Sequence, residues 1–112
     1  MKESDFQKKL IDKLKILFPE CEIMKQDPKY CTGIPDLVVF YHDKYAMLEV
    51  KKSEKAYKHS LENQSIQTYY VDKFSKWSYA SYVYPENLEK VLYELQEVFL
   101  KWKSSFSISI LK

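Results

Sequence analysis

The fold is decided by residues 37–50, LVVFYHDKYAMLEV. Two runs, 37–41 and 45–50, are rich in β-branched and aromatic residues, and they flank the polar segment 42–44. Such a pattern is typical of two β-strands joined by a tight turn. The sequence therefore predicts a β-hairpin at the centre of the chain.

The register of this hairpin follows from its turn. If the turn is centred between His42 and Asp43, residues that face each other have numbers that sum to 85. Asp36 and Glu49 meet this condition, so we expect their side chains on one face of the sheet, with Cβ atoms roughly 4.5–5.5 Å apart. A shift of one residue would separate the two carboxylates onto opposite faces.

The elements around the hairpin follow from periodicity and from turn residues. Apolar residues at helical spacing in 6–18 predict an amphipathic helix, and 21–24 alternates as a short strand. We expect a lysine-rich loop over 51–60, and then a helix from Leu61 to about Phe74 that is capped by Ser60.

The C-terminal third continues this pattern. Residues 77–84 alternate as a fourth strand, and Pro85 opens a last helix with a clean apolar face. The tail, 105–112, alternates like an edge strand or an arm that pairs with a second subunit. Because a strand, a helix and a further strand usually form a right-handed crossover, the fourth strand should be parallel to its neighbour in the sheet. The expected fold is a single α/β domain over 1–112, with a mixed central sheet flanked by helices.

Composition narrows the function classes. The chain has 112 residues and a formal charge of +2, and no run approaches the roughly 18 apolar residues that a membrane helix needs. We expect an intracellular, cytoplasmic protein without a membrane partner. All 18 basic residues are lysines, so no guanidinium fork can read guanine edges, and contacts to nucleic acid should favour the backbone over the bases.

The facing carboxylates of Asp36 and Glu49 point to a metal ion. Two like charges on adjacent strands repel unless a cation lies between them or one takes up a proton. Mg²⁺ suits such a place, because it binds to one or two carboxylates, keeps several waters and completes its shell with phosphate oxygens, and Mn²⁺ should substitute. Alternation puts Lys51 on the same face, where it could hold an attacking water. The alternative is a solvated carboxylate pair with Lys51 as its ordinary counter-charge.

The cysteines and histidines are weaker candidates for metal ligands. Cys21 and Cys31 lack the spacing of a zinc site, and we interpret them as reduced thiols. His42 and His59 have no second histidine or cysteine at ligand spacing, and we interpret them as surface residues.

The segments Gly33-Ile34-Pro35-Asp36 and Leu48-Glu49-Val50-Lys51 resemble the signature of the PD-(D/E)XK nuclease superfamily. The only glycine, Gly33, stands where a turn with positive φ would be cheapest. The compact size is most similar to the VRR-NUC and Holliday-junction-resolvase branches, and the order of elements to the restriction-endonuclease-like α-β-β-β-α-β core. The resemblance implies a Mg²⁺-dependent endonuclease acting on branched or structured DNA.

The resemblance also implies roles for further residues. Gln64 would support the site as a phosphate or water contact, with Gln67, one turn on, as the competing candidate. Glu3 would be an extra acidic metal ligand, unless it is only a favourable charge near a helix N-terminus. The backbone carbonyl of Val50 would also bind the metal.

The lysine run after the second hairpin strand, Lys52, Lys55 and Lys58, could follow a DNA backbone, or it could be an ordinary solvated loop. A homodimer would make the cutting of both strands easiest in so small a protein. The rival hypothesis is a nuclease-fold DNA-binding protein without catalysis, and RNA cleavage ranks last.

Overall fold

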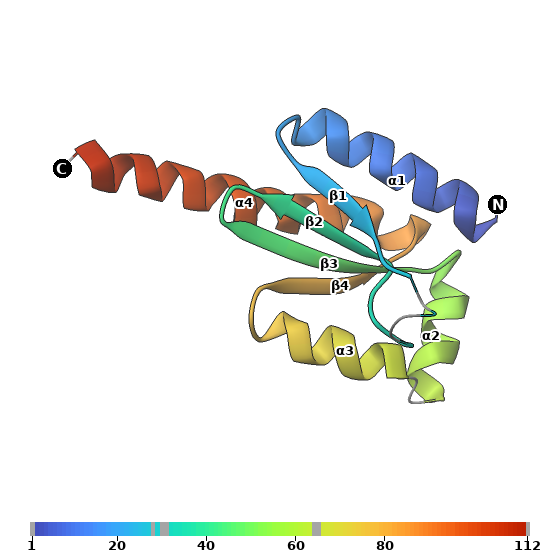
Figure 1. The fold of residues 1–112 in the computed structure, drawn as a ribbon. Helices are drawn as coiled ribbons and strands as arrows, with labels where there is room; N and C mark the ends of the chain where they lie inside the picture. Colours follow the sequence, from blue (N-terminus) through green and yellow to red (C-terminus); the bar gives the residue numbers. More distant parts are fainter. Residues whose placement is uncertain (1, 28, 30–31, 64–65, 112) are drawn as a thin grey trace.

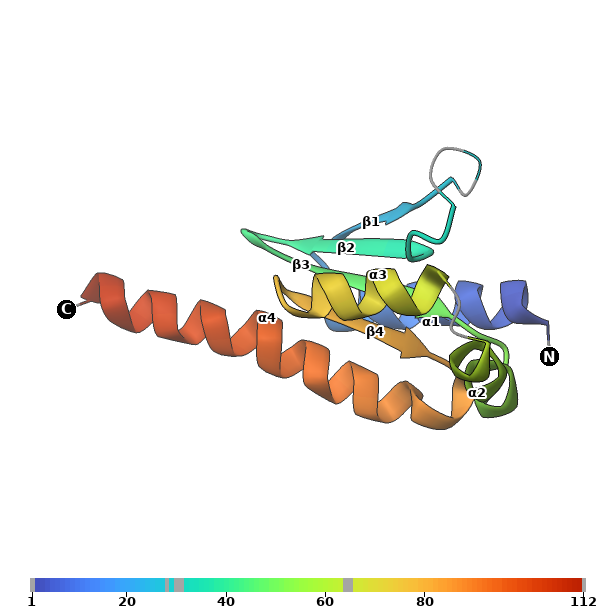
Figure 2. The same cartoon turned by 90° about the horizontal axis from the view of Figure 1, so that it is seen from below.

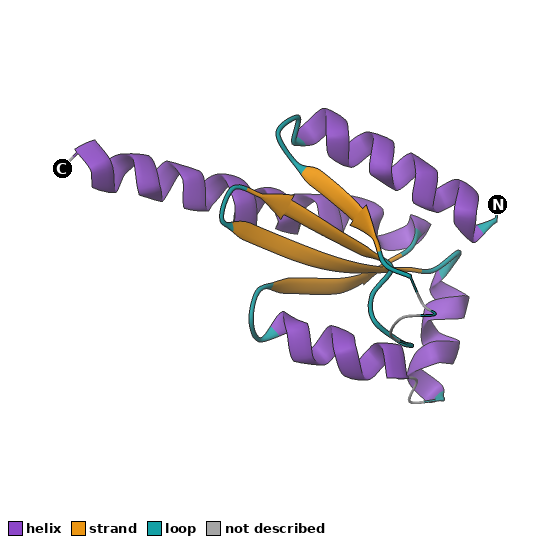
Figure 3. Ribbon diagram, viewed as in Figure 1, coloured by secondary structure: helices purple, strands orange, loops and turns teal. Residues whose placement is uncertain are grey.

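The structure is a computed structural model that describes residues 2–27, 29, 32–63 and 66–111, with side chains as far as residue 100. Its elements are, in chain order, α1 (Glu3–Leu17), β1 (Glu22–Lys25), β2 (Leu37–Tyr41), β3 (Lys44–Val50), α2 (Glu54–Glu62), α3 (Ile66–Ser75), β4 (Tyr79–Val83), the short 3₁₀ helix η1 (Pro85–Asn87) and α4 (Leu88–Leu111) (Figures 1 and 3).

One mixed sheet forms the centre of the fold. Its strand order is β1-β2-β3-β4, so every strand neighbours the next one in the sequence. β1 with β2 and β2 with β3 are antiparallel, whereas β3 and β4 are parallel and are connected through α2 and α3. The predicted α/β fold with a mixed sheet and a parallel fourth strand is confirmed.

The predicted hairpin register is also confirmed. Leu37 faces Leu48, and Tyr41 faces Lys44 across a two-residue turn. His42 has a φ of 57°, in the left-handed region that few side chains adopt without cost. This register places Asp36, which directly precedes β2, beside Glu49 near the end of β3.

Helices cover the two faces of the sheet. On one face, α1 and α4 bury a single apolar core against β2, β3 and β4, with Leu10, Leu48 and Phe99 fully buried at its centre. On the other face, Val71 of α3 packs with Tyr82 and Tyr84 in a smaller cluster. α2 stands at the end of the sheet where β3 finishes (Figure 2). The carboxylates of Asp36 and Glu49 therefore lie at the edge between α3 and α2.

The prediction for residues 51–74 was wrong in two respects. The expected loop over 51–60 is mostly helix α2, whose N-cap is Ser53, with its side chain accepting a hydrogen bond from the Ala56 N–H. The expected single helix from Leu61 to about Phe74 is divided between two helices. Leu61 and Glu62 end α2, and α3 begins at Ile66. α2 has only nine residues and buries none of them completely, so the apolar side of this helix is short.

Residues 105–112 were predicted as an edge strand or as an arm that pairs with a second subunit. The strand was wrong, since α4 continues as a helix to Leu111, whereas the pairing with a second subunit stays a prediction. Neither glycine nor proline occurs after Pro85, so nothing in the sequence terminates the helix. Its C-terminal half extends past the sheet (Figure 1). Within the described part of the chain, no helix combines the length and the apolarity needed to cross a bilayer.

Candidate active site

Main-chain hydrogen bonds hold the side chains of Asp36 and Glu49 in place. The Asp36 N–H donates to Glu49 Oε1 at 3.2 Å, and the Val50 N–H donates to Asp36 Oδ2 at 2.9 Å. Each carboxylate therefore has one oxygen oriented by the opposite strand. Of the second oxygens, Glu49 Oε2 lies 3.8 Å from Lys51 Nζ.

Burial makes this pair electrostatically costly. Glu49 is 1% exposed, and burial together with the charge of Asp36 raises its pKa from 4.5 to about 8. Burial also raises the pKa of Asp36, although the Val50 N–H and the charge of Lys51 oppose the change. Near neutral pH the pair therefore holds a proton, which a metal cation could replace.

Lys51 lies on the face predicted by strand alternation. Its Nζ is 3.8 Å from Glu49 Oε2 and donates a hydrogen bond to Gln67 Oε1 at 2.8 Å. The Lys51 side chain is only 14% exposed, and its backbone N–H donates to the Val83 carbonyl at 2.9 Å. The ammonium is thus held between a β3 carboxylate and an α3 amide.

The choice between two glutamines concerns which one supports Lys51. Gln67 makes this contact from the first turn of α3. Gln64, the first choice from the sequence, lies outside the described residues. Among the described residues, Gln67 thus contacts Lys51, and the role of Gln64 stays a prediction.

Gly33 ties the loop before Asp36 to the start of α3. Its φ is +87°, as predicted, and a β-carbon at this position would collide with the side chain of Ile66. Only glycine combines this φ with such a close approach. The contact helps set the position of Gln67, the next residue on α3.

An open cleft lies beside Lys51, and neither Asp36 nor Glu49 is among its lining residues. It has a volume of about 650 Å³, and its lining residues are Glu3, Lys51, Lys52, Ser53, Lys55, Ala56, His59 and Ser60. Burial and the charge of Asp36 raise the pKa of Glu3, while Lys51 and Lys52 lower it. The charges of the site therefore act on Glu3, at the N-terminus of α1, but among the described residues Glu3 does not join Asp36 and Glu49 in a group that could hold a metal.

The three predicted DNA-binding lysines line two adjoining hollows. Lys52 and Lys55 line the cleft. Lys58 lines a neighbouring hollow of about 420 Å³, which Lys55 also lines, and its Nζ is 3.8 Å from Glu54 Oε1. His59 and Ser60 line the cleft but were not predicted to do so, because their orientation follows only once α2 is known to begin at Glu54.

The oxygen atoms of the site can be compared with the ligands that a metal ion requires. Among the described residues, no three histidine, cysteine, aspartate or glutamate side chains are grouped closely enough to hold a metal. Mg²⁺ requires only one or two carboxylates, because waters and substrate oxygens complete its shell. Asp36, Glu49 and the Val50 carbonyl, all oxygen donors, fit this hard cation. His42 instead forms an ion pair with Glu20 at 2.9 Å.

Comparisons of the whole chain with protein-family models, with curated proteins and with solved structures gave no match. The interpretation of the site therefore depends on its own residues and geometry.

Proposed function

We propose that this protein is a Mg²⁺-dependent DNA endonuclease of the PD-(D/E)XK type. The observation that carries the proposal is the buried pair Asp36 and Glu49, with Lys51 Nζ 3.8 Å from Glu49 Oε2. A carboxylate pair that raises the pKa of Glu49 to about 8 is costly to maintain, and perturbed groups of this kind concentrate at functional sites. The metal dependence, the DNA substrate and the superfamily are all parts of this proposal.

The chain's own residues divide the chemistry among them. Asp36 and Glu49, with the Val50 carbonyl, would hold the cation, which would polarise the scissile phosphate and stabilise the leaving oxygen. Lys51 would orient the attacking water and offset negative charge that develops on the phosphate. Gln67 would restrict the Lys51 ammonium to one direction, because it accepts a hydrogen bond from Nζ at 2.8 Å.

Lysines beside the pair supply the contact to the DNA backbone. Lys52 and Lys55 line the cleft next to Lys51 and carry positive charge on the path that a phosphate would take. Without them, the acidic pair would repel the substrate. Lys58, paired with Glu54, would contribute less.

The preferred DNA and the oligomeric state are part of the same proposal. The sequence resemblance supports branched or structured DNA, and the absence of arginine from the chain favours recognition of shape and backbone over bases. One site per chain favours a homodimer for cutting both strands of a junction. Sedimentation with and without DNA measures this directly.

The test is cleavage of labelled four-way junction, duplex and single-stranded DNA in Mg²⁺, Mn²⁺ or EDTA, with products separated on a denaturing gel. Asp36→Asn and Lys51→Met remove one group each with little change of shape. Asp43→Asn is the matched control, since it changes a carboxylate to an amide at the turn end of the same hairpin, away from the site.

We expect metal-dependent cuts in the wild type and the control, and a loss of about 10²-fold or more in the two site variants. Binding of DNA without cleavage in either metal would instead support a nuclease-fold DNA-binding protein. Cleavage that survives in Asp36→Asn would exclude the proposed site.

A further inference from the structure

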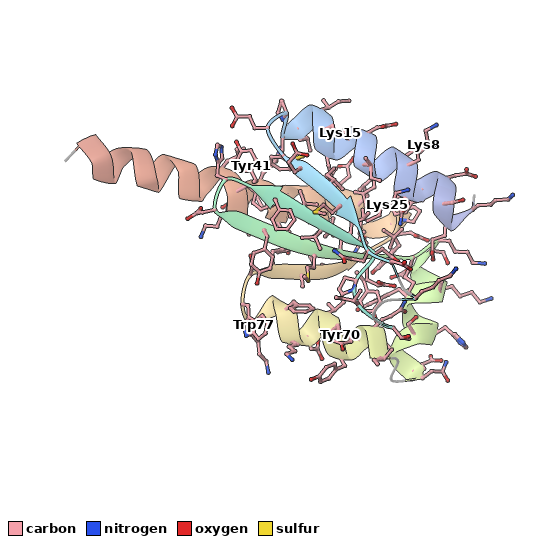
Figure 4. The ribbon with its side chains drawn as sticks, viewed as in Figure 1. Lys8, Lys15, Lys25, Tyr41, Tyr70 and Trp77 are labelled. Carbon is pink, nitrogen blue, oxygen red and sulfur yellow. The ribbon has the colours of Figure 1, made fainter. Side chains whose placement is uncertain are left out.

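Four aromatic side chains form a continuous row along α3. The ring centroids of Tyr69 and Tyr70 are 5.1 Å apart, those of Tyr70 and Phe74 are 5.9 Å apart, and those of Phe74 and Trp77 are 5.4 Å apart. Lys73 Nζ lies 5.8 Å from the Tyr69 ring centroid and 5.6 Å from the Trp77 centroid. We call these five residues the aromatic row, and Tyr70 and Trp77 mark its course in Figure 4.

The two end rings of the aromatic row are exposed. Tyr69 is 57% exposed and Trp77 is 64% exposed, although both are large rings, whereas Tyr70, Lys73 and Phe74 between them are half-buried. Val71 makes the contact of α3 with the sheet. Packing against the sheet therefore does not account for the exposed rings of Tyr69 and Trp77.

The aromatic row begins next to the candidate active site and leads away from it. Its first residues follow Ile66 and Gln67, which contact Gly33 and Lys51 respectively. At the other end, Trp77 shares a hollow of about 410 Å³ with Asp43, Lys44 and Tyr45 at the turn end of the hairpin. The row therefore runs from the active-site end of the hairpin toward its turn.

The length and chemistry of the row fit a particular occupant. From Gln67 to Ser75, α3 rises by about 12 Å at 1.5 Å per residue, which corresponds to about three to four phosphates of one DNA strand. Aromatic rings next to lysines bind single strands, because every base has a flat face that can stack and every nucleotide a negative charge. A duplex hides those base faces within its own stack.

We infer that the aromatic row is a stacking surface for unpaired nucleotides that lie next to the phosphate held at the active site. This inference rests on the proposed nuclease function and narrows its substrate class to DNA with a single-stranded segment at the cut, such as a flap, tail or open junction. The row positions that segment, and Lys73 contributes charge to it.

Binding can be measured apart from cleavage. We would determine the affinity of a labelled short oligo(dT) and of a matched duplex by fluorescence anisotropy in EDTA, where no cut occurs. The variants are Tyr69→Ala, Trp77→Ala and Lys73→Ala. Tyr93→Ala is the matched control, because Tyr93 is 62% exposed but lies on α4. Circular dichroism checks that each exposed substitution leaves the fold intact.

A second readout reports the stacking contact itself. The chain has two tryptophans, so in a Trp102→Phe background the emission comes from Trp77 alone. Stacking of a base on this indole should quench the emission as oligo(dT) is added, and unlabelled duplex should quench it less.

We expect oligo(dT) to bind more tightly than duplex, and each aromatic variant to weaken its binding about tenfold with an unchanged salt dependence. Lys73→Ala should lower the salt dependence by about one counterion. The inference is overturned if Tyr69→Ala and Trp77→Ala bind like Tyr93→Ala, if oligo(rU) binds more tightly than oligo(dT), or if Trp77→Ala converts a dimer into a monomer.

The two proposals can fail separately. Row-dependent binding of oligo(dT) with no cleavage in Mg²⁺ or Mn²⁺ would uphold the stacking surface and reject the nuclease. Cleavage that requires Asp36 but is indifferent to the row would uphold the nuclease and reject the stacking surface.

Discussion

Asp36 and Glu49 stand on neighbouring strands, and each accepts a hydrogen bond from the main chain of the other's strand. The two carboxylates are thus held together by the hairpin even though their charges repel. Only a proton or a cation relieves the repulsion within this buried pair. The stability of the protein should therefore depend on pH and on metal in ways that can be measured.

The first prediction concerns pH and stability without metal. Because the pKa of Glu49 is raised from 4.5 to about 8, the folded state binds more protons than the unfolded state between these values. The free energy of unfolding should fall as pH rises through this window, by an amount on the order of a few kcal/mol, and level off above it. Urea denaturation in EDTA at about pH 6 and about pH 9 measures the fall.

Glu49→Gln is the variant that isolates this effect. A neutral amide keeps the shape but carries no titrating group, so the variant should be more stable than the wild type at alkaline pH and should lose most of the pH dependence. A wild type and a variant whose stabilities change in parallel with pH would show that Glu49 is not the group responsible.

The second prediction concerns metal binding. A cation that displaces the proton on the pair binds more tightly as pH rises, and a ligand of the folded state raises the melting temperature. We expect the increase of Tm by Mn²⁺ to grow between about pH 6.5 and about pH 8.5 and to vanish in Asp36→Asn. An equal increase in that variant would place the cation elsewhere.

The third prediction concerns Gln67 as a positioning residue. Gln67→Ala removes the amide oxygen that accepts the hydrogen bond from Lys51 Nζ but leaves the ammonium in place. We expect kcat of DNA cleavage to fall about tenfold with little change in KM, because orientation is lost while binding is kept. Gln67→Glu, which restores an acceptor, should recover part of the rate. Gln96→Ala on α4 is the matched control, and a loss of equal size there would contradict the role.

The fourth prediction concerns Gly33. Gly33→Ala imposes a side chain where φ is +87° and where a β-carbon collides with Ile66. We expect a loss of about 2 kcal/mol or more in the free energy of unfolding, part from the left-handed backbone and part from the collision. Urea denaturation of the Gly33→Ala/Ile66→Ala double variant separates the two parts, since it should recover only the steric one. Full additivity of the single variants would remove Ile66 from the explanation.

The hairpin could be predicted from sequence because its signal is local. Two apolar runs and a short polar turn fix the register, and the register alone brings Asp36 beside Glu49. The helical split of residues 51–75 could not be predicted in this way. Tyr57 attaches α2 by its ring contacts with Tyr82 and Tyr84, whose centroids lie 5.0 Å and 4.9 Å away, and these partners lie more than twenty residues further along the chain.

The glutamine that contacts Lys51 could not be predicted for the same reason, because the bounds of α2 and α3 were not predicted. Gln67 faces Lys51 from the first turn of α3, next to Ile66, which lies close to Gly33. Residue types at the site were therefore readable from the sequence, whereas the contact between Lys51 and Gln67 required the tertiary structure.

The two-residue turn at His42 and Asp43 also bears on the order in which the protein folds. Hairpins close within microseconds, whereas the parallel pairing of β3 with β4 must wait until the chain between them has wrapped around. We expect the acidic half of the site to form early and the contact between Lys51 and Gln67 to form late. Mutations in the hairpin should then slow refolding, while those in α3 should mainly hasten unfolding.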